Sequence, residues 1–302
     1  MKHIFCIFIL LNLFLMGCSQ ETEVPIKKAA IYFESVSADS SGIKFKNELY
    51  HLNDLNIIEY LYYYNGGGVA IGDINNDGLE DIYFTANQTP DRLYLNLGNL
   101  KFRDITEEAG IIIDSSWSTG VTMEDVNNDG LLDIYVSKVG NYKNLKAHNL
   151  LYINKGNNTF EELSSDYGLD FSGFSTQASF FDYDNDGDMD MYLMNHAVHT
   201  PRSYGDISRR RINDSLSGDK LYENKLNEGI IKFSDVTTAS GIYSSVLGYG
   251  LALITSDINN DGLIDIYVGN DFHENDYLYI NQGDKTFKES SADYFKIGRA
   301  HV

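Results

Sequence analysis

A nine-residue pattern, D-x-[DN]-x-D-G-x-x-D, occurs four times along this chain of 302 residues. The four copies begin at Asp73, Asp125, Asp182 and Asp257. At ordinary residue usage such a match arises on the order of once per 10⁵–10⁶ starting positions. Four copies therefore form an internal repeat, and the fold must be built from similar units.

Each copy is accompanied by further shared elements at similar spacing. A strand-like tripeptide follows the Asp pattern directly, a Leu-Tyr-x-Asn element comes later, and a Phe follows that element. The tripeptides are Ile82-Tyr83-Phe84, Ile134-Tyr135-Val136, Met191-Tyr192-Leu193 and Ile266-Tyr267-Val268, and the later residues are Phe102, Phe160, Phe233 and Phe287. With one strand before the Asp pattern, each unit has four short strands, which is typical of a propeller blade. The sequence therefore predicts an all-β fold, a β-propeller of four-stranded blades with an incomplete ring, in which neighbouring blades stack.

The stretch before the first Asp pattern is similar to the end of a repeat. Phe33 and Gly42-Ile43 approximate the Phe…Gly-Ile ending of the first three units. Propellers often remove an open edge by pairing an N-terminal strand into the last blade. We therefore expect residues 30–46 to form such a closing strand.

The Asp pattern has the chemistry of a loop that binds a hard cation. Oxygen-bearing side chains stand at positions 1, 3, 5 and 9, and Gly stands at position 6. Ca²⁺ takes about six to eight oxygens at about 2.3–2.6 Å, and the backbone carbonyl of position 7 would add one. The predicted ligands are Asp73, Asn75, Asp77, Leu79 and Asp81; Asp125, Asn127, Asp129, Leu131 and Asp133; Asp182, Asp184, Asp186, Asp188 and Asp190; and Asp257, Asn259, Asp261, Leu263 and Asp265. The sequence therefore predicts Ca²⁺ as the cofactor, and Mg²⁺ is disfavoured because it keeps water in an octahedral shell.

Two other interpretations of these loops compete with calcium binding. An EF-hand requires Glu at position 12 and flanking helices, but position 12 holds Phe84, Val136, Leu193 and Val268. The Asp residues could instead only cap turns through bonds to nearby backbone. That role needs one or two such side chains, whereas the third loop has Asp at positions 1, 3, 5, 7 and 9. Without a cation these five carboxylates would repel one another.

The Asp loops with their Ile-Tyr-Val-like strands resemble FG-GAP/VCBS repeats, as in the propellers of integrin α-subunits. The Leu-Tyr-x-Asn and Phe elements resemble a bacterial type, the VCBS-repeat lipoproteins of Bacteroidetes-like bacteria that end in an ASPIC/UnbV domain. The repeats cover roughly residues 66–289. The resemblance implies a full-length propeller of seven or eight blades with Ca²⁺ in inter-strand loops, and it implies no established catalytic residues. This chain has no ASPIC/UnbV segment, so nothing about that domain is transferred.

The N-terminus has the pattern of a lipoprotein signal. Residues 1–17 contain one Lys and then a mostly apolar run, which predicts a signal peptide that is cleaved. Leu15-Met16-Gly17-Cys18 resembles a lipobox, so Cys18 would carry lipid and residues 18–29 would form a tether. An ordinary signal peptide with a chance Cys is the alternative. We expect an outer membrane lipoprotein, periplasmic or surface-exposed, and no disulfide, because Cys6 lies in the cleaved part.

The last six residues look foreign to the repeat. The string ATC GGA AGA GCA CAC GTC TGA would encode Ile297-Gly298-Arg299-Ala300-His301-Val302 and a stop. It resembles the start of a common sequencing adapter. We therefore expect residues 30–296 to be a partial propeller, and residues 297–302 to be a non-native tail on a C-terminally truncated fragment. A natural C-terminus is the alternative.

Two loops carry candidate residues for a small ligand. The insertion in the third unit holds His196, His199 and Arg202, and the matching loop of the fourth unit holds His273 and Glu274. Loops on one face of a propeller commonly bind ligands, but a solvated loop is the competing interpretation. Separately, Tyr62, Tyr63 and Tyr64 are expected on a strand, with a sugar-stacking patch as the alternative.

The charge and motifs limit the function classes. The net charge is −21, which disfavours nucleic acid as a partner because phosphates would be repelled. The chain has no G-x-S-x-G, H-E-x-x-H or Cys/His arrangement. The preferred function is a calcium-binding, lipid-anchored surface propeller that binds a protein or glycan partner, which makes an enzyme the less favoured class. The alternative is an extracellular propeller enzyme, a polysaccharide lyase or hydrolase, that uses loops of units three and four.

Overall fold

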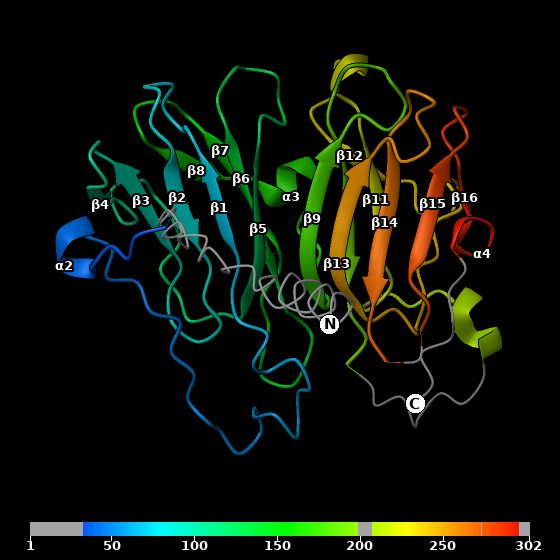
Figure 1. Ribbon diagram of the computed structural model, residues 1–302, viewed down its shortest axis with the longest axis horizontal. Helices are drawn as coiled ribbons and strands as arrows, with labels where there is room; N and C mark the ends of the chain where they lie inside the picture. The colour runs from blue at the N-terminus through cyan, green and yellow to red at the C-terminus, as the bar shows by residue number, and fades with distance from the viewer. Residues whose placement is uncertain (1–32, 199–206, 273, 296–302) are drawn as a thin grey trace, which may run out of the picture. The chain divides into compact units, whose positions relative to one another are not determined.

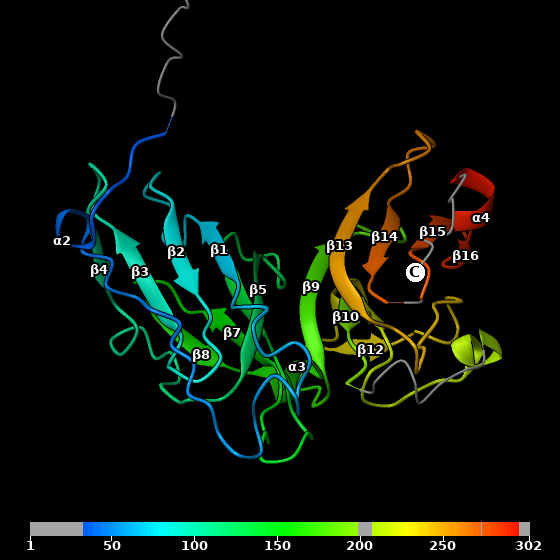
Figure 2. The ribbon, with the colours of Figure 1, turned by 60° about the horizontal axis from the view of Figure 1, so that its bottom comes forward.

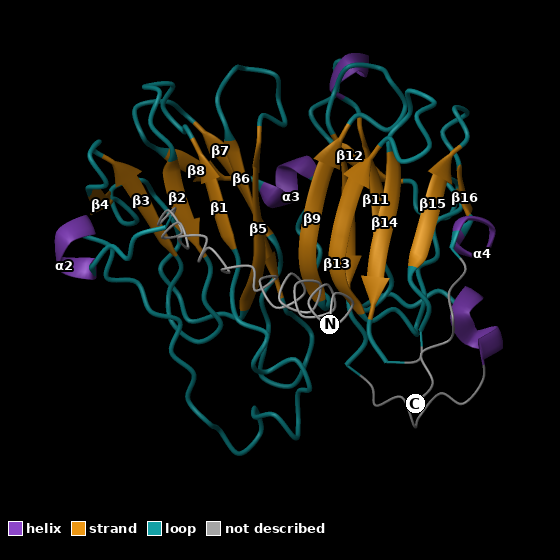
Figure 3. Cartoon of the chain, viewed as in Figure 1, coloured by secondary structure: helices purple, strands orange, loops and turns teal. Residues whose placement is uncertain are grey.

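The computed structural model describes residues 33–198, 207–272 and 274–295. Its described part contains four four-stranded antiparallel sheets, and each sheet takes its strands in chain order (Figures 1 and 3). The strands are β1 (Val69–Gly72), β2 (Asp81–Phe84), β3 (Arg92–Asn96), β4 (Phe102–Asp104); β5 (Ser118–Glu124), β6 (Asp133–Lys138), β7 (Leu150–Asn154), β8 (Phe160–Glu162); β9 (Ser175–Phe181), β10 (Asp190–Asn195), β11 (Lys220–Asn224), β12 (Phe233–Asp235); and β13 (Gly250–Ser256), β14 (Asp265–Asn270), β15 (Tyr277–Asn281), β16 (Phe287–Glu289). The predicted all-β fold with one sheet per repeat is confirmed.

Helices are short in the described part. They are α2 (Ala38–Ser41), α3 (Ser164–Tyr167), α4 (Ser291–Tyr294), and the 3₁₀ turns η2 (Ile207–Arg211) and η3 (Leu226–Glu228). Over the described ranges, none of these helices has the length and apolar character that crossing a bilayer requires. The predicted signal peptide, Cys18 and the tether up to residue 29 lie outside the described residues.

The first strands of consecutive sheets lie side by side. β1 contacts β5, β5 contacts β9, and β9 contacts β13 (Figures 1 and 2). The remaining strands of each sheet follow outward in order. This is the arrangement of successive propeller blades, with the first strand of each blade innermost, and the four described blades do not close into a ring.

Glycines allow the inner strands to approach closely. A Cβ added at Gly120 on β5 would lie 2.4 Å from the carbonyl oxygen of Thr176 on β9. A Cβ at Gly68, just before β1, would lie 2.9 Å from the carbonyl oxygen of Thr119. Any side chain at Gly120 would therefore force neighbouring blades apart.

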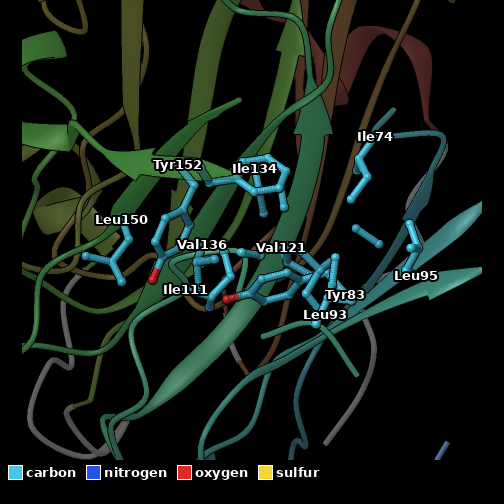
Figure 4. Close-up of a cluster of buried hydrophobic side chains, with 14 residues drawn as sticks. Ile74, Tyr83, Leu93, Leu95, Ile111, Val121, Ile134, Val136, Leu150 and Tyr152 are labelled. Atoms are coloured by element: carbon cyan, nitrogen blue, oxygen red, sulfur yellow. The ribbon is translucent and has the colours of Figure 1, made fainter. Parts of the chain in front are cut away.

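The hydrophobic core is divided between blade interfaces. The first cluster joins Tyr83 and Leu93 of the first blade to Ile134, Val136 and Tyr152 of the second (Figure 4). Two further clusters join the second blade to the third and the third to the fourth. Each blade thus buries its faces against its neighbours, which confirms the stacking inferred from the repeat.

The expected closing strand is wrong for the described part of its range. Residues 33–46 contain helix α2 and no strand, and α2 lies beside β4 (Figures 1 and 2). Ser37 caps the helix, and Gly42 ends it at φ 87°, a left-handed conformation that does not continue into a strand.

The same segment is nevertheless the end of a repeat, as its sequence indicates. A Cβ at Gly42 would lie 2.3 Å from the carbonyl oxygen of Phe102 on β4. Gly110, Gly168 and Gly241 approach Phe160, Phe233 and Phe287 of the following blade in the same way. Each Gly-Ile or Gly-Leu ending therefore packs on the outer strand of the next blade.

Candidate metal centre

The Asp loops join the first two strands of each sheet and lie at one end of the sheets, the upper edge in Figure 1. In every loop two residues have positive φ: the Asn at position 4 and the Gly at position 6. They are Asn76, Asn128, Asn185 and Asn260, with Gly78, Gly130, Gly187 and Gly262. Asn and Gly tolerate this left-handed conformation best. The Asn at position 4 of every loop is thus a sequence signal for the turn. It is not among the predicted ligands, so its role is in the backbone conformation.

Loops one, two and four fold their polar side chains onto their own backbone. In loop one, Asp73 Oδ2 accepts from the Gly78 N–H at 2.7 Å, and Asp73 Oδ1 accepts from the Asp77 N–H at 3.1 Å. Asn75 Oδ1 accepts from the same Asp77 N–H at 3.1 Å. These are the bonds that the turn-capping interpretation predicts. They leave further lone pairs on the carboxylates, so they are compatible with a cation as well.

The Asp at position 9 ties the loop to the third strand of its blade. Asp133 is buried; its Oδ2 accepts from the Val126 N–H at 3.1 Å and its Oδ1 from the Asn154 N–H at 2.8 Å. Asp190 has the same two partners in blade three. Burial raises the pKa of Asp133 to about 7 and that of Asp190 to about 8, although these N–H groups favour the charged form.

Loop three brings three carboxylates together. One oxygen each from Asp182, Asp184 and Asp190 lies within 4.8 Å of the other two. Two oxygens that both lie about 2.3–2.6 Å from a Ca²⁺ ion are at most about 5 Å apart, so the spacing fits that cation. Within the described ranges, no other group of three or more acidic, His or Cys side chains is this close.

Loop three also contains buried carboxylate oxygens without hydrogen bonds. Among the described residues, Oδ1 of Asp184 and Oδ1 of Asp188 have no hydrogen-bond partner, whereas Oδ2 of Asp184 pairs with Lys285 Nζ at 2.5 Å. Asp188 Oδ2 accepts from the Asn227 N–H at 3.0 Å, and burial raises the pKa of Asp188 to about 6. Buried carboxylates are costly unless paired or bound to a metal. The donor set of loop three therefore fits Ca²⁺.

In the second, third and fourth repeats the Asn of the Leu-Tyr-x-Asn element joins two blades. Asn154 Nδ2 of blade two donates to the Ile74 carbonyl of the preceding loop at 2.8 Å and to the Leu132 carbonyl of its own loop at 3.0 Å. Asn224 and Asn281 make the corresponding bonds one and two blades later. The second residue of a loop is thus held by the next repeat, a role that the sequence motif alone did not reveal.

A second repeated contact lies at the opposite end of the strands. The residue two before each Leu-Tyr-x-Asn element bonds to the Tyr of the tripeptide after the Asp loop. The pairs are Tyr83–Asp91 at 3.4 Å, Asn149–Tyr135 at 2.9 Å, Tyr192–Asp219 at 2.8 Å and Tyr267–Asp276 at 2.6 Å. The position of the Asp or Asn, two residues before the Leu-Tyr-x-Asn element, is visible in the sequence. The sequence predicts the Tyr on a strand but does not predict its bond to this Asp or Asn.

The candidate ligand loops form separate contacts. His196 is buried, its Nε2 lies 2.8 Å from the Tyr60 hydroxyl, and burial lowers its pKa to about 3. The Glu274 carboxylate pairs with Arg210 and accepts from the Tyr277 hydroxyl at 2.6 Å. The structure therefore gives His196 and Glu274 different partners. His199, Arg202, His273 and the tail at residues 297–302 lie outside the described residues.

The three consecutive tyrosines are not on a strand, so that expectation is wrong. They lie in turns before β1, where Tyr62 and Tyr63 are buried in an aromatic cluster with Trp117, while Tyr64 is exposed. The Tyr63 ring packs against Trp117, and the Tyr62 ring packs against His196. Tyr62, Trp117 and His196 line a cavity of 280 Å³ at the start of the inner strands.

Comparisons with known proteins agree with the repeat architecture. Cartilage acidic protein 1 from Homo sapiens is 33% identical over 135 residues, which are 43% of this chain and 20% of that protein. Cartilage acidic protein 1 from Xenopus tropicalis is 25% identical over 207 residues, 68% of this chain and 28% of that protein. The chain thus spans less than a third of the length of these relatives.

The family described as FG-GAP-like repeat matches residues 73–136, 139–193 and 257–301. The first and third ranges begin at the first Asp of loops one and four, whereas the second begins directly after β6 and includes loop three. The match covers more than half of the chain, so the chain belongs to the family of proteins with FG-GAP-like repeats.

Proposed function

We propose that this chain is part of a calcium-stabilised extracellular β-propeller that binds a protein or glycan partner. The observation that carries the calcium proposal is loop three, where Asp182, Asp184 and Asp190 converge and one buried oxygen of Asp184, Oδ1, has no hydrogen bond. The corresponding residues of the other three loops are proposed as further ligands, because they share the pattern and the backbone turn.

In this proposal the carboxylates hold Ca²⁺ and the ion supplies positive charge that reduces their mutual repulsion. Asp190 positions the loop by accepting from the N–H groups of Tyr183 and Asn224. Asn224 Nδ2 also bonds to the Val126 carbonyl in the preceding loop. The metal would therefore stabilise the joint between blades as well as the loop.

The FG-GAP-like repeats support the general part of this proposal, a binding module of the propeller type. The kind of ligand that we propose, a protein or a glycan bound at the loops, rests on the position of these loops at one face of the stacked blades. The enzyme alternative gains no specific support, because His196 and Glu274 are engaged by Tyr60 and Arg210. Binding is therefore the function we favour.

We also propose lipid attachment at Cys18, in an outer membrane lipoprotein of the bacterial type that the motif resembles. The support is the sequence Leu15-Met16-Gly17-Cys18 after an apolar run. Intact mass spectrometry of the protein from a bacterial membrane fraction tests this. A lipid-modified Cys18 at the mature N-terminus is expected, and Cys18→Ser should release the protein from the membrane.

The calcium proposal is tested by thermal unfolding of the full chain in excess Ca²⁺ and in chelator. Because a ligand that binds only the folded state raises its stability, Ca²⁺ should raise the melting temperature. Asp182→Asn with Asp190→Asn should reduce that increase, whereas Asp293→Asn, which removes an exposed carboxylate paired with Lys288, should not. A melting temperature that is the same with and without Ca²⁺ would contradict the proposal.

A further inference from the structure

A lysine of the fourth repeat reaches into the loop of the third. Lys285 lies in the turn between β15 and β16. Its Nζ is 2.5 Å from Asp184 Oδ2 and 2.6 Å from Glu223 Oε1. The Asp184 side chain is 1% exposed, while that of Lys285 is 53% exposed. The amine therefore approaches the loop from the solvent side and pairs with a buried carboxylate.

Loop three differs from the other loops where this lysine binds. Position 3 is Asn in loops one, two and four, and that Asn accepts from the N–H of position 5. In loop three the position is Asp184, and the N–H of Asp186 donates only to Asp182, a bond that the other three loops also make. The carboxylate of Asp184 makes no hydrogen bond within the loop and faces Lys285.

The additional acid and the lysine occur together. Counted from the Asn of the Leu-Tyr-x-Asn element, the residues equivalent to Lys285 in blades one and two are Leu100 and Asn158, which are uncharged. Blade two, which carries Asn158, follows a loop with Asn at position 3. Blade four, which carries Lys285, follows the loop with Asp at position 3. In blade three, where the turn is longer, the residue at this count is Glu228. Among the four blades a basic residue stands at this position only in blade four, which follows the loop with the additional acid.

We propose that Lys285 is a built-in counter-cation for loop three that competes with the metal ion for Asp184. This inference rests on the proposed calcium binding. Ca²⁺ and the ammonium group both bind carboxylate oxygen at short range, and like charges held about 5 Å apart repel strongly near a protein surface. Metal entry therefore displaces Lys285 from Asp184, which lowers the affinity of loop three and loosens its contact with the fourth repeat.

The first test is a calorimetric Ca²⁺ titration of the full chain and of Lys285→Met. We expect one site of the variant to bind Ca²⁺ about three- to tenfold more tightly at low salt. Lys288→Met is the matched control, since it removes the same charge from a lysine that pairs with exposed Asp293, and it should leave the titration unchanged. Introduced into an Asp184→Asn background, Lys285→Met should no longer tighten binding.

The second test uses the unmodified protein and does not depend on folding of a variant. Amine acetylation followed by mass spectrometry measures the reactivity of each lysine in chelator and in Ca²⁺. Lys285 should react several-fold faster in Ca²⁺, while the reactivity of Lys288 stays constant. Equal reactivity of Lys285 under both conditions overturns the competition.

The outcomes separate this inference from the proposed function. If the wild type binds Ca²⁺ but Lys285→Met binds it equally or more weakly, the role of Lys285 is refuted and calcium binding stands. If neither protein binds Ca²⁺, the proposed function is refuted and the competition with it. Tighter binding by Lys285→Met and by Lys288→Met alike would reduce the effect to net charge and also refute the role of Lys285.

Discussion

The bond that Asn154 makes across the first blade interface leads to a prediction with an internal control. Asn154→Ala removes the bonds from Nδ2 to the carbonyls of Ile74 and Leu132 and the bond from the Gly156 N–H to Oδ1. Asn154 is 2% exposed and Ile74 is fully buried, so no water replaces the lost donor at the Ile74 carbonyl. Three hydrogen bonds at about 0.5–1.5 kcal/mol each, with one carbonyl left unsatisfied at about 1–3 kcal/mol, predict a loss of about 2.5–7.5 kcal/mol.

Asn96 is the same motif position in the first repeat, where no described blade precedes it. Its Nδ2 bonds to the exposed Glu80 carbonyl, and its Oδ1 accepts from the Gly98 N–H. Asn96→Ala should therefore cost about 1–3 kcal/mol, because water can reach both groups. The difference between the two variants, about 1.5–4.5 kcal/mol, is the contribution of the bond between blades.

Urea unfolding followed by far-UV circular dichroism and by fluorescence of the single Trp measures both losses. The measurements belong in chelator, so that metal binding does not add to the stability. Equal losses for Asn154→Ala and Asn96→Ala would refute the reasoning, since the two variants differ mainly in the bond to the preceding blade. The repeat would then owe its stability to apolar stacking alone.

The remaining predictions concern charge burial, close packing and exposed apolar faces. Burial raises the pKa of Asp219 to about 7, so its contribution to stability is present at pH 4 and is lost as the pH rises toward 8. The free energy of unfolding should therefore fall between pH 4 and pH 8, and Asp219→Asn should make this fall smaller by on the order of 2–4 kcal/mol, measured by urea unfolding at both pH values. Gly120→Ala should destabilise the chain by more than about 2 kcal/mol, because its Cβ would clash with the Thr176 carbonyl. Ile71 and Ile254 are 60% and 57% exposed on the first and fourth blades, so changing both to Glu should reduce self-association in sedimentation velocity experiments.

Each of these predictions has a matched control in the chain. Repeat two already carries Asn149 at the position of Asp219, so an unchanged pH profile in Asp219→Asn would contradict the assigned cause. Gly269→Ala places its Cβ 3.3 Å from the Ala252 side chain and should cost less than Gly120→Ala. Ile230→Glu changes a loop residue that is 50% exposed. If it reduced self-association as much as the double variant does, the blade faces would not be the cause of that association.

The repeat spacing was enough to predict the blades. Every unit carries its own Asp loop and strand-like tripeptide, so local signals at Asp73 and Ile82 already define the first hairpin without long-range information. The end of the preceding unit was harder to place. Gly42 marks a repeat ending, as the sequence indicated, but its positive φ stops α2 and excludes the extended strand we expected.

The candidate site was predictable as a set of residues and less so as a geometry. The pattern identifies all four loops alike, yet among the described residues only loop three brings three carboxylates within 4.8 Å of one another. That difference depends on Asp184 and on Lys285, which are 101 positions apart in the chain. The Tyr60–His196 contact is equally non-local, with 136 positions between its partners. Contacts of this kind depend on how blades dock, which a pattern within one repeat does not encode.

The bond from Asn154 to Ile74 also bears on how such an array can change in evolution. The donor and the acceptor of each joint lie in different repeats, but every repeat carries both a donor and an acceptor. Duplicating one whole repeat therefore creates a new neighbour with a ready-made joint on each side. Deleting part of a repeat removes its donor, its acceptor or both, and so leaves at least one joint incomplete. Gene duplication in units of whole repeats is the change that this architecture accommodates most readily.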